Sequence, residues 1–208
     1  SVPFAFGIHI VTALLYSGLA ARAGWMTAIL APKFLATAFA SGSSLLLLLA
    51  GWLTSTGRLP ISGAAMGRLA IIMTYALCAT LLFSALEVFT AVYSGIPAMG
   101  HHALHLLDPF GHESGFAFLL LLSLGLDSLA LVILLVPSLR RSRRGVYGAG
   151  AMVIAATLVE KGLIFIPSGF APSAFGENIG YHPSLAEALV AGGVYSVALL
   201  IFTALLGP

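Results

Sequence analysis

Six apolar segments, each about as long as a bilayer core is thick, dominate this sequence. A helix needs about 20 consecutive apolar residues to cross that core, and irregular backbone exposed to lipid would lack hydrogen-bond partners. Only 8% of the residues are charged, against roughly 25% in soluble domains. We therefore expect a single, all-α membrane domain, a polytopic bundle of transmembrane helices. The expected spans are residues 3–21, 28–53, 67–94, 116–137, 146–166 and 185–206.

Basic residues concentrate in the connection between the fourth and fifth expected spans. This connection, Ser138–Gly145, contains four arginines and no acid, and the positive-inside rule places it in the cytoplasm. Alternation of the spans puts Arg58 and Arg68 on the same side. The acidic and histidine-rich segments 97–114 and 167–184 then face the opposite, periplasmic side.

Several ionisable residues lie inside the apolar segments, where a charge is costly and usually marks a function. Glu87 is either a structural carboxyl bonded to a neighbouring helix or a proton-handling group. Tyr93 is either an interfacial anchor or a ligand contact. Lys33 either extends its amine to the interface or pairs with a carboxylate. Asp127, in the middle of the fourth span, is either protonated and hydrogen-bonded or part of a proton path.

A histidine lies inside the first span. His9 shares one helical face with Thr12 and Tyr16, and its imidazole can bond a neighbouring helix, contact a quinone carbonyl or relay a proton. Haem ligation would need a second axial ligand from a facing helix. Further along, Glu160 and Lys161 are adjacent in the fifth span, and neighbours on a helix do not face each other. We therefore expect each of these two to have a separate partner.

Metal and cluster ligands are scarce. The histidines of segment 97–114 include His101 and His105 at helical spacing, but we interpret the segment as an exposed loop rather than a zinc site and expect no metal. The only cysteine is Cys78, which excludes an internal disulfide. It also excludes a self-contained iron–sulfur cluster, which needs about four thiolates. We expect Cys78 to be a small buried hydrophobic residue.

Four stretches of the chain together resemble the NrfD/PsrC family of quinone-interacting membrane subunits. They are Ser1–Ala13, Trp25–Gly42, Glu87–Ser94 and Glu160–Phe170, followed by Tyr181-His-Pro-Ser and Glu187. Within the family the chain is most similar to the DsrP-type subunit of the sulfite-reduction-associated complex. Family members usually have more spans, so the resemblance implies the C-terminal part of a longer chain. Lys33 stands where related subunits are expected to have arginine, so a bidentate contact would be lost.

The resemblance implies a function in respiration and sulfur metabolism. It implies a non-autonomous subunit of a quinol-dependent oxidoreductase complex in a bacterial or archaeal cytoplasmic membrane, with no haem or iron–sulfur cluster of its own and no nucleic-acid partner. Such a subunit binds menaquinone or ubiquinone and exchanges electrons with a periplasmic ferredoxin-like iron–sulfur subunit. A multihaem cytochrome c and other membrane redox subunits are the further partners. The nearly uncharged segment 166–184, rich in Pro and Gly, is expected to dock a partner at the membrane surface.

Quinol oxidation releases two protons and two electrons, so its site needs hydrogen-bond partners for both oxygens and a proton acceptor. We expect proton transfer by Glu87, His9 and Asp127, with Glu160 as a further candidate. We expect quinone contacts from His9, Thr12, Glu87, Tyr93 and Lys33. Two other classes stay open. A proton- or ion-coupled transporter would more often show internal repeats with broken helices, and an inert membrane anchor for a redox partner would not need these side chains for turnover.

Overall fold

A computed structural model of the chain describes residues 2–19, 22–58, 60–107, 115–166, 169 and 184–205. The chain divides into two compact units, residues 1–178 and residues 179–208, and each is described by itself. The helices of the first unit are α1 (Val2–Ser17), η1 (Ala23–Trp25), α2 (Leu30–Ser55), α3 (Gly63–Tyr93), α4 (Pro97–Leu107), α5 (Gly115–Leu135), α6 (Pro137–Arg140), α7 (Arg143–Leu158) and the π-helix η2 (Val159–Phe165). The second unit contributes α9 (Leu185–Leu205).

The predicted all-α membrane fold is confirmed within the described residues. In the part of the chain that the structure describes, five helices are long and apolar enough to cross a membrane: Leu30–Ser55, Gly63–Tyr93, Ala117–Leu135, Arg143–Phe165 and Leu185–Leu205. The first predicted span is a shorter apolar helix, which ends at Ser17 rather than at Ala21. The Ser17 hydroxyl donates to the Leu14 carbonyl at 3.1 Å, and Gly18 follows.

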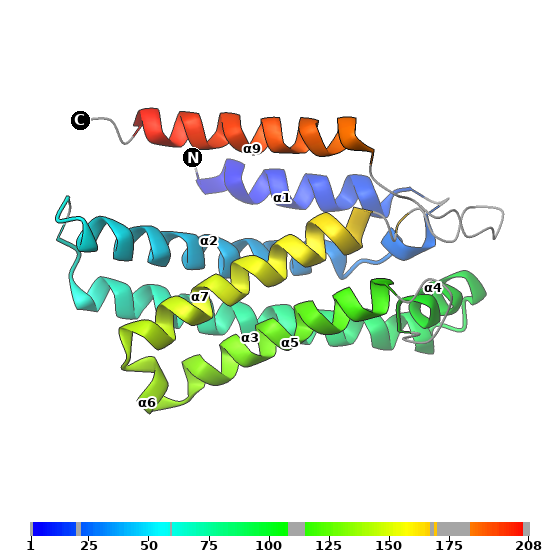
Figure 1. Cartoon of the computed structure of the whole chain (residues 1–208). Helices are drawn as coiled ribbons and strands as arrows, with labels where there is room; N and C mark the ends of the chain where they lie inside the picture. The colour runs from blue at the N-terminus through cyan, green and yellow to red at the C-terminus, as the bar shows by residue number, and fades with distance from the viewer. Residues whose placement is uncertain are drawn as a thin grey trace. The chain divides into compact units, whose positions relative to one another are not determined.

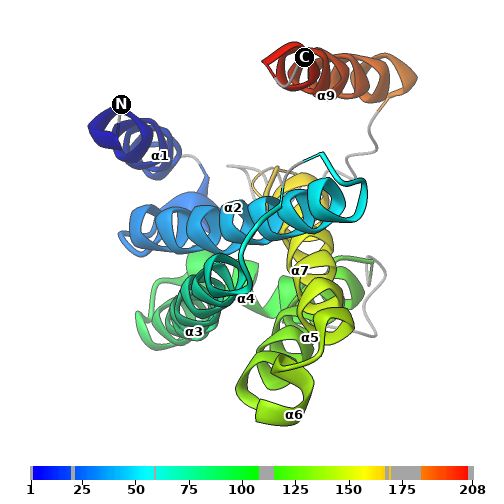
Figure 2. The same cartoon turned by 90° about the vertical axis from the view of Figure 1, so that its left-hand side faces the viewer.

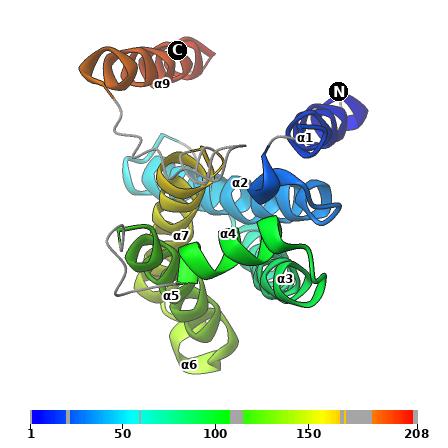
Figure 3. The same cartoon turned by 90° about the vertical axis from the view of Figure 1, so that its right-hand side faces the viewer.

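Four long helices of the first unit surround its core. Helix α2 contacts α3 and α7, and α5 contacts the same two helices from the other side (Figures 1 and 2). Helix α1 packs on α2, where the rings of Phe6 and Phe39 lie 5.6 Å apart. At one end α4 lies across α3 and α5 (Figure 3). At the other end α6 joins α5 to α7 (Figure 1).

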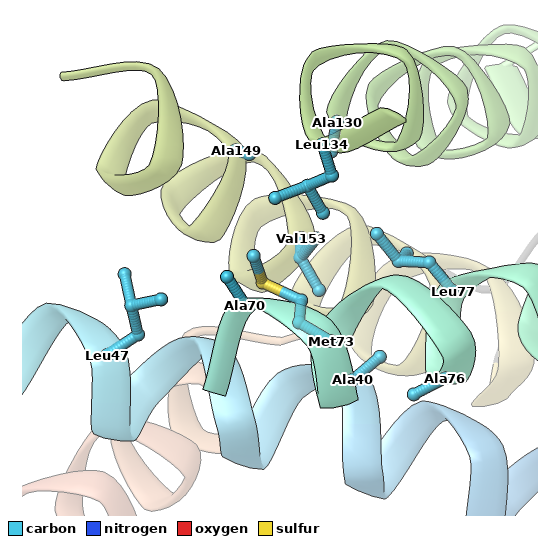
Figure 4. Close-up of a cluster of buried hydrophobic side chains, with 10 residues drawn as sticks. All are labelled: Ala40, Leu47, Ala70, Met73, Ala76, Leu77, Ala130, Leu134, Ala149 and Val153. Atoms are coloured by element: carbon cyan, nitrogen blue, oxygen red, sulfur yellow. The ribbon is translucent and has the colours of Figure 1, made fainter. Parts of the chain in front are cut away.

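The core of this unit is made of small residues interleaved with a few large ones. Its buried members are Ala40, Leu47, Ala70, Met73, Ala76, Leu77, Ala130, Leu134, Ala149 and Val153 (Figure 4). Helices in lipid gain little from hydrophobic transfer, so close backbone approach over small residues and dispersion hold them together. Ser44 in α2 adds a polar contact, because its hydroxyl lies 2.6 Å from the Ala40 carbonyl and 2.9 Å from the Met73 sulfur.

The structure differs from the sequence expectations at the histidine-rich segment and at Cys78. The histidine-rich segment is not a loop over residues 97–107, because it forms α4, with Pro97 at the first helical position and apolar residues at helical spacing. Cys78 is exposed on the outside of α3 rather than buried. An apolar thiol needs no burial where the surrounding medium is lipid, which is why this prediction was wrong. The docking segment falls outside the described residues, apart from 166, 169 and 184.

Candidate functional site

Four charged side chains meet inside the first unit. The Lys33 Nζ atom lies 2.6 Å from Glu87 Oε2 and 2.9 Å from Glu160 Oε1. The Lys161 Nζ atom lies 3.3 Å from that same Glu160 oxygen. These four residues, here called the charged cluster, carry two formal positive and two formal negative charges, so they compensate one another. Lys33 and Glu160 keep only 11% and 12% of their side-chain surface, whereas Glu87 keeps 28%. Glu87 is therefore the more accessible carboxylate bonded to Lys33.

The antiparallel arrangement of α2 and α3 explains this meeting. Lys33 lies in the first turn of α2, and Glu87 lies near the end of α3. Antiparallel neighbours bring such positions to the same depth, although 54 residues separate the two in sequence. Of the alternatives left open for Lys33, the structure shows pairing with carboxylates. For Glu87 it shows a bond to a neighbouring helix, which is compatible with either predicted role.

Glu160 and Lys161 lie in a π-helical segment that continues α7. The expectation of a separate partner is confirmed for Glu160, whose Oε1 atom lies 2.9 Å from Lys33 Nζ. The expectation that the two residues do not face each other was wrong, because Lys161 Nζ donates to Glu160 Oε1 at 3.3 Å. A π-helix has i→i+5 hydrogen bonds and turns through a smaller angle per residue than an α-helix, so adjacent side chains lie closer together. Trp25 Nε1 donates to the Phe165 carbonyl at 2.9 Å, where this segment ends. Single π-helical turns frequently mark functional sites.

Aromatic rings cover one side of the charged cluster. Lys161 Nζ lies 4.2 Å from the ring centre of Phe34 and 5.5 Å from that of Phe165, both within cation–π range. Phe165 also contacts Trp25 and Tyr16, at centroid distances of 5.5 and 5.1 Å. These rings cover part of Lys161, whose side chain remains 26% exposed, and hold η2 against α1 and η1.

A pocket of about 310 Å³ opens beside the charged cluster. It lies between the end of α3, the helix α4, and η1, with apolar walls that include residues of α5. Polar residues make up the smaller part of its lining. They include Lys33, Glu87, Glu160, Ser84, Thr90 and His102. Largely apolar pockets with a few convergent polar groups are the usual form of a small-molecule site.

His102 is a pocket residue that the sequence interpretation missed. It was predicted to lie on an exposed loop, but it is 7% exposed and its ring packs against Gly24. A Cβ on Gly24 would overlap the imidazole, so any larger residue there would force the His102 ring to move. The signal was present in the sequence, since Met99, Ala103 and Leu106 share a helical face with His102. The side chains of His101 and His105 lie outside the described residues.

Asp127 lies in the middle of α5 and is 4% exposed. Its Oδ1 atom has no hydrogen-bond partner among the described residues. It interacts electrostatically with Glu160 and Lys33, but it does not line the pocket. One turn earlier, the Ser123 hydroxyl donates to the Ala156 carbonyl at 3.1 Å and fixes α5 against α7. Asp127 is therefore a buried carboxyl near Glu160 and Lys33 that lies outside the pocket lining.

Three predicted contact residues do not line the pocket. His9 Nδ1 lies 2.9 Å from the carbonyl oxygen of Ala5 in its own helix, and Thr12 is half-buried one turn further along α1. Tyr93 is 80% exposed and stacks on Phe89 at 5.3 Å. The structure thus brings Lys33 and Glu87 together, and leaves the roles of His9, Thr12 and Tyr93 as predictions.

The fold and site define a multi-pass helical membrane protein with a buried, charge-balanced cluster beside a pocket. Residues 1–171 match the family described as "Polysulphide reductase, NrfD", and the match includes α1 through η2. The chain therefore belongs to the NrfD family. No curated protein gives a significant match. Family membership suggests a membrane quinone-interacting subunit of a redox complex, and NrfD proteins typically partner with iron–sulfur subunits.

Proposed function

We propose that this chain binds menaquinol or ubiquinol in the pocket beside the charged cluster and passes its electrons to a partner iron–sulfur subunit. The observation that carries the proposal is the pocket itself. It has apolar walls, it lies at one end of the bundle, and ionisable groups from α2, α3 and η2 reach it. A quinone head group needs such an apolar slot and hydrogen-bond partners for its two oxygens.

The pocket volume suits a head group. Its 310 Å³ lies at the lower end of the range of about 300–1,000 Å³ for small-molecule sites, so the isoprenoid tail would extend into lipid. His102, Thr90 and Lys33 supply hydrogen-bonding groups at the pocket wall. His102 replaces His9 as the histidine closest to the proposed head group.

The geometry supports Glu87 as the first proton acceptor. Oxidation of a quinol to a quinone releases two protons and two electrons, and the electrons leave one at a time to the iron–sulfur partner. A proton on Glu87 would weaken its 2.6 Å ion pair with Lys33. Lys33 would remain paired with Glu160 at 2.9 Å. The second carboxylate thus keeps the lysine compensated while Glu87 changes its charge.

Glu160 and Asp127 extend this proton route into the bundle in the proposal. An uncompensated carboxylate at this depth is costly, which favours a protonated Asp127 that can donate as well as accept. His9, Thr12 and Tyr93 would act outside the pocket, at the entrance of the tail or in a separate proton step.

The expected partners follow from the ends of the bundle. The pocket lies opposite the arginine-rich end, so the positive-inside rule gives the pocket a periplasmic position. This supports a periplasmic ferredoxin-like partner, accompanied by a multihaem cytochrome c as in a DsrP-type complex of sulfur metabolism. We propose that segment 166–184 contributes to the docking surface, since it directly follows η2.

A steric test separates this proposal from the inert anchor. Ala91 lines the pocket, whereas Ala85 lies on the exposed surface of the same helix. We expect Ala91→Leu in the intact complex to raise the KM for a quinol analogue and to weaken inhibition by a quinone analogue at least tenfold. Ala85→Leu adds the same volume outside the pocket, so the KM and the inhibition should each change less than twofold. Equal behaviour of the two variants would exclude this pocket as the quinone site.

A flux measurement separates this proposal from a transporter. A proton- or ion-coupled transporter, reconstituted in proteoliposomes without any partner subunit, would carry a proton or ion flux that does not depend on quinone. We expect no such flux above that of empty liposomes, and quinol oxidation only when the iron–sulfur subunit is present.

A further inference from the structure

A second pocket, unrelated to the charged cluster, lies at the opposite end of the first unit. Its volume is about 440 Å³, and it lies between the end of α2, the start of α3 and the turn that joins α6 to α7. Arg140, Arg141 and Arg143 line one part of it, together with Ser142. Apolar residues line the rest, among them Met66, Ala70, Ile71 and Val146. One end of the pocket is therefore strongly basic and the other is apolar.

The arginines of this pocket have no acidic neighbour in the segments that form it. Residues 52–68 and 136–147 contain six arginines and no acid. Arg140, Arg141 and Arg143 have no carboxylate partner among the described residues, whereas the ion pairs Lys33–Glu87, Lys33–Glu160 and Lys161–Glu160 all lie in the charged cluster. Three guanidinium groups that line one pocket without a carboxylate among the described residues give that pocket a positive potential, which attracts an anion.

The helix that starts at the pocket adds further positive potential. Helix α7 is 16 residues long and begins at Arg143, with Ser142 as its N-cap accepting from the Gly145 amide at 3.4 Å. The remaining amide groups of the first turn and the helix dipole favour an anion there. The ring of Tyr147 packs against Gly51 of α2 and fixes this turn, since a Cβ on Gly51 would lie only 2.6 Å from the ring.

We propose that this pocket binds the phosphate head group of an anionic phospholipid, such as phosphatidylglycerol. Guanidinium groups and a helix N-terminus match a phosphate. The apolar part continues along α3 to Ile71, which is 46% exposed, and so offers a path for an acyl chain. The pocket lies at the end of membrane-crossing helices, where basic pockets between helices bind anionic lipid head groups. The mixed lining favours a lipid over a soluble anion or an acidic protein segment.

Lipid retention by the intact protein tests the proposal. The protein is purified in mild detergent and delipidated, and native mass spectrometry then compares phosphatidylglycerol with phosphatidylcholine of the same acyl chains. We expect one phosphatidylglycerol to bind at least tenfold more tightly than phosphatidylcholine. The triple variant Arg140→Gln, Arg141→Gln, Arg143→Gln should reduce this preference below threefold.

A matched triple variant controls for diffuse electrostatics. Arg58, Arg68 and Arg144 belong to the same basic end but do not line the pocket. Their joint replacement by Gln removes the same charge and should leave the preference within twofold of the wild type. Equal losses in the two triple variants would show a general surface attraction and overturn the site.

A steric variant avoids any change of charge. Gly67 lines the pocket, and a Cβ there would meet nothing within 4 Å. Gly67→Leu should fill the pocket and reduce phosphatidylglycerol binding at least fivefold. Gly125 lies on α5 outside the pocket, and a Cβ there also meets nothing within 4 Å, so Gly125→Leu should leave the binding unchanged. Retained binding in Gly67→Leu would contradict the proposal. Displacement of the lipid by millimolar inorganic phosphate or glycerol phosphate would contradict a lipid as the ligand and favour a soluble one.

Discussion

Among the described residues, charged residues are paired with each other at one end of the bundle and unpaired at the other. At one end four charged residues, of which Lys33 and Glu160 are buried, compensate each other through ion pairs of 3.3 Å or less, beside an apolar pocket. At the other end six arginines are exposed and no acid accompanies them. Buried charges must be paired because removal of a partner leaves an uncompensated ion in low dielectric. Charges at the bilayer surface remain hydrated, so they can stay unpaired and set orientation and lipid contacts.

The largest effect should come from loss of the shared cation. Lys33→Met leaves Glu87 and Glu160 without their bond to it, and breaking a buried ion pair costs about 3–5 kcal/mol. We expect the free energy of unfolding in detergent to fall by about this amount. Lys33→Arg should lower the free energy of unfolding less than Lys33→Met, because arginine keeps the positive charge.

A double variant sharpens the interpretation. Lys33→Met combined with Glu160→Gln removes one charge of each sign, and it should recover part of the stability that Lys33→Met loses. If Lys33→Met unfolded like the wild type, the charged cluster would not contribute to stability as described.

The next effect concerns turnover rather than folding. Glu87→Gln keeps the shape of the side chain but cannot accept a proton, and general base catalysis typically contributes about 10²–10⁴-fold. We expect quinol oxidation by the intact complex to fall about 100-fold, with a smaller change in the KM for the quinol. Unchanged turnover would refute the proton-acceptor role and favour the inert anchor.

A smaller effect distinguishes the two histidines. His102→Asn retains polarity but loses the imidazole that lines the pocket, and we expect a fall in kcat/KM for the quinol of about tenfold, or about 1.4 kcal/mol. The loss for His9→Asn should be smaller, because His9 does not line the pocket. A larger fall in kcat/KM for His9→Asn than for His102→Asn would indicate that the quinone contacts α1 instead of this pocket.

The smallest effect is expected at the arginine-rich end. Arg144→Gln removes an exposed charge that has no ion-pair partner among the residues that the structure describes, and surface substitutions of this kind usually change stability by less than about 0.5 kcal/mol. Thermal unfolding of the purified variant, with Lys33→Met as the contrast, measures this difference. A loss above about 1 kcal/mol would mean that this end contains a structural contact comparable to those of the charged cluster.

Much of the fold follows from local sequence. The length of the apolar segments determined the helices and their approximate bounds, because lipid leaves a spanning backbone no alternative to internal hydrogen bonds. The placement of arginine marked one end of the bundle. The cost of burying charge singled out Lys33, Glu87 and Asp127 before any contact was known.

Tertiary structure decided which of these residues meet. Lys33 and Glu87 come together because α2 and α3 are antiparallel neighbours. Glu160 joins them because α7, which η2 continues, packs against α2. The helical face that His102 shares with Met99 and Leu106 could be read from the sequence, but only the packing of α4 on η1 made His102 a pocket residue. Such contacts depend on helix rotation and depth. Residue type and spacing within one helix therefore identify charges that need partners, whereas the packing of separate helices determines which partners they have.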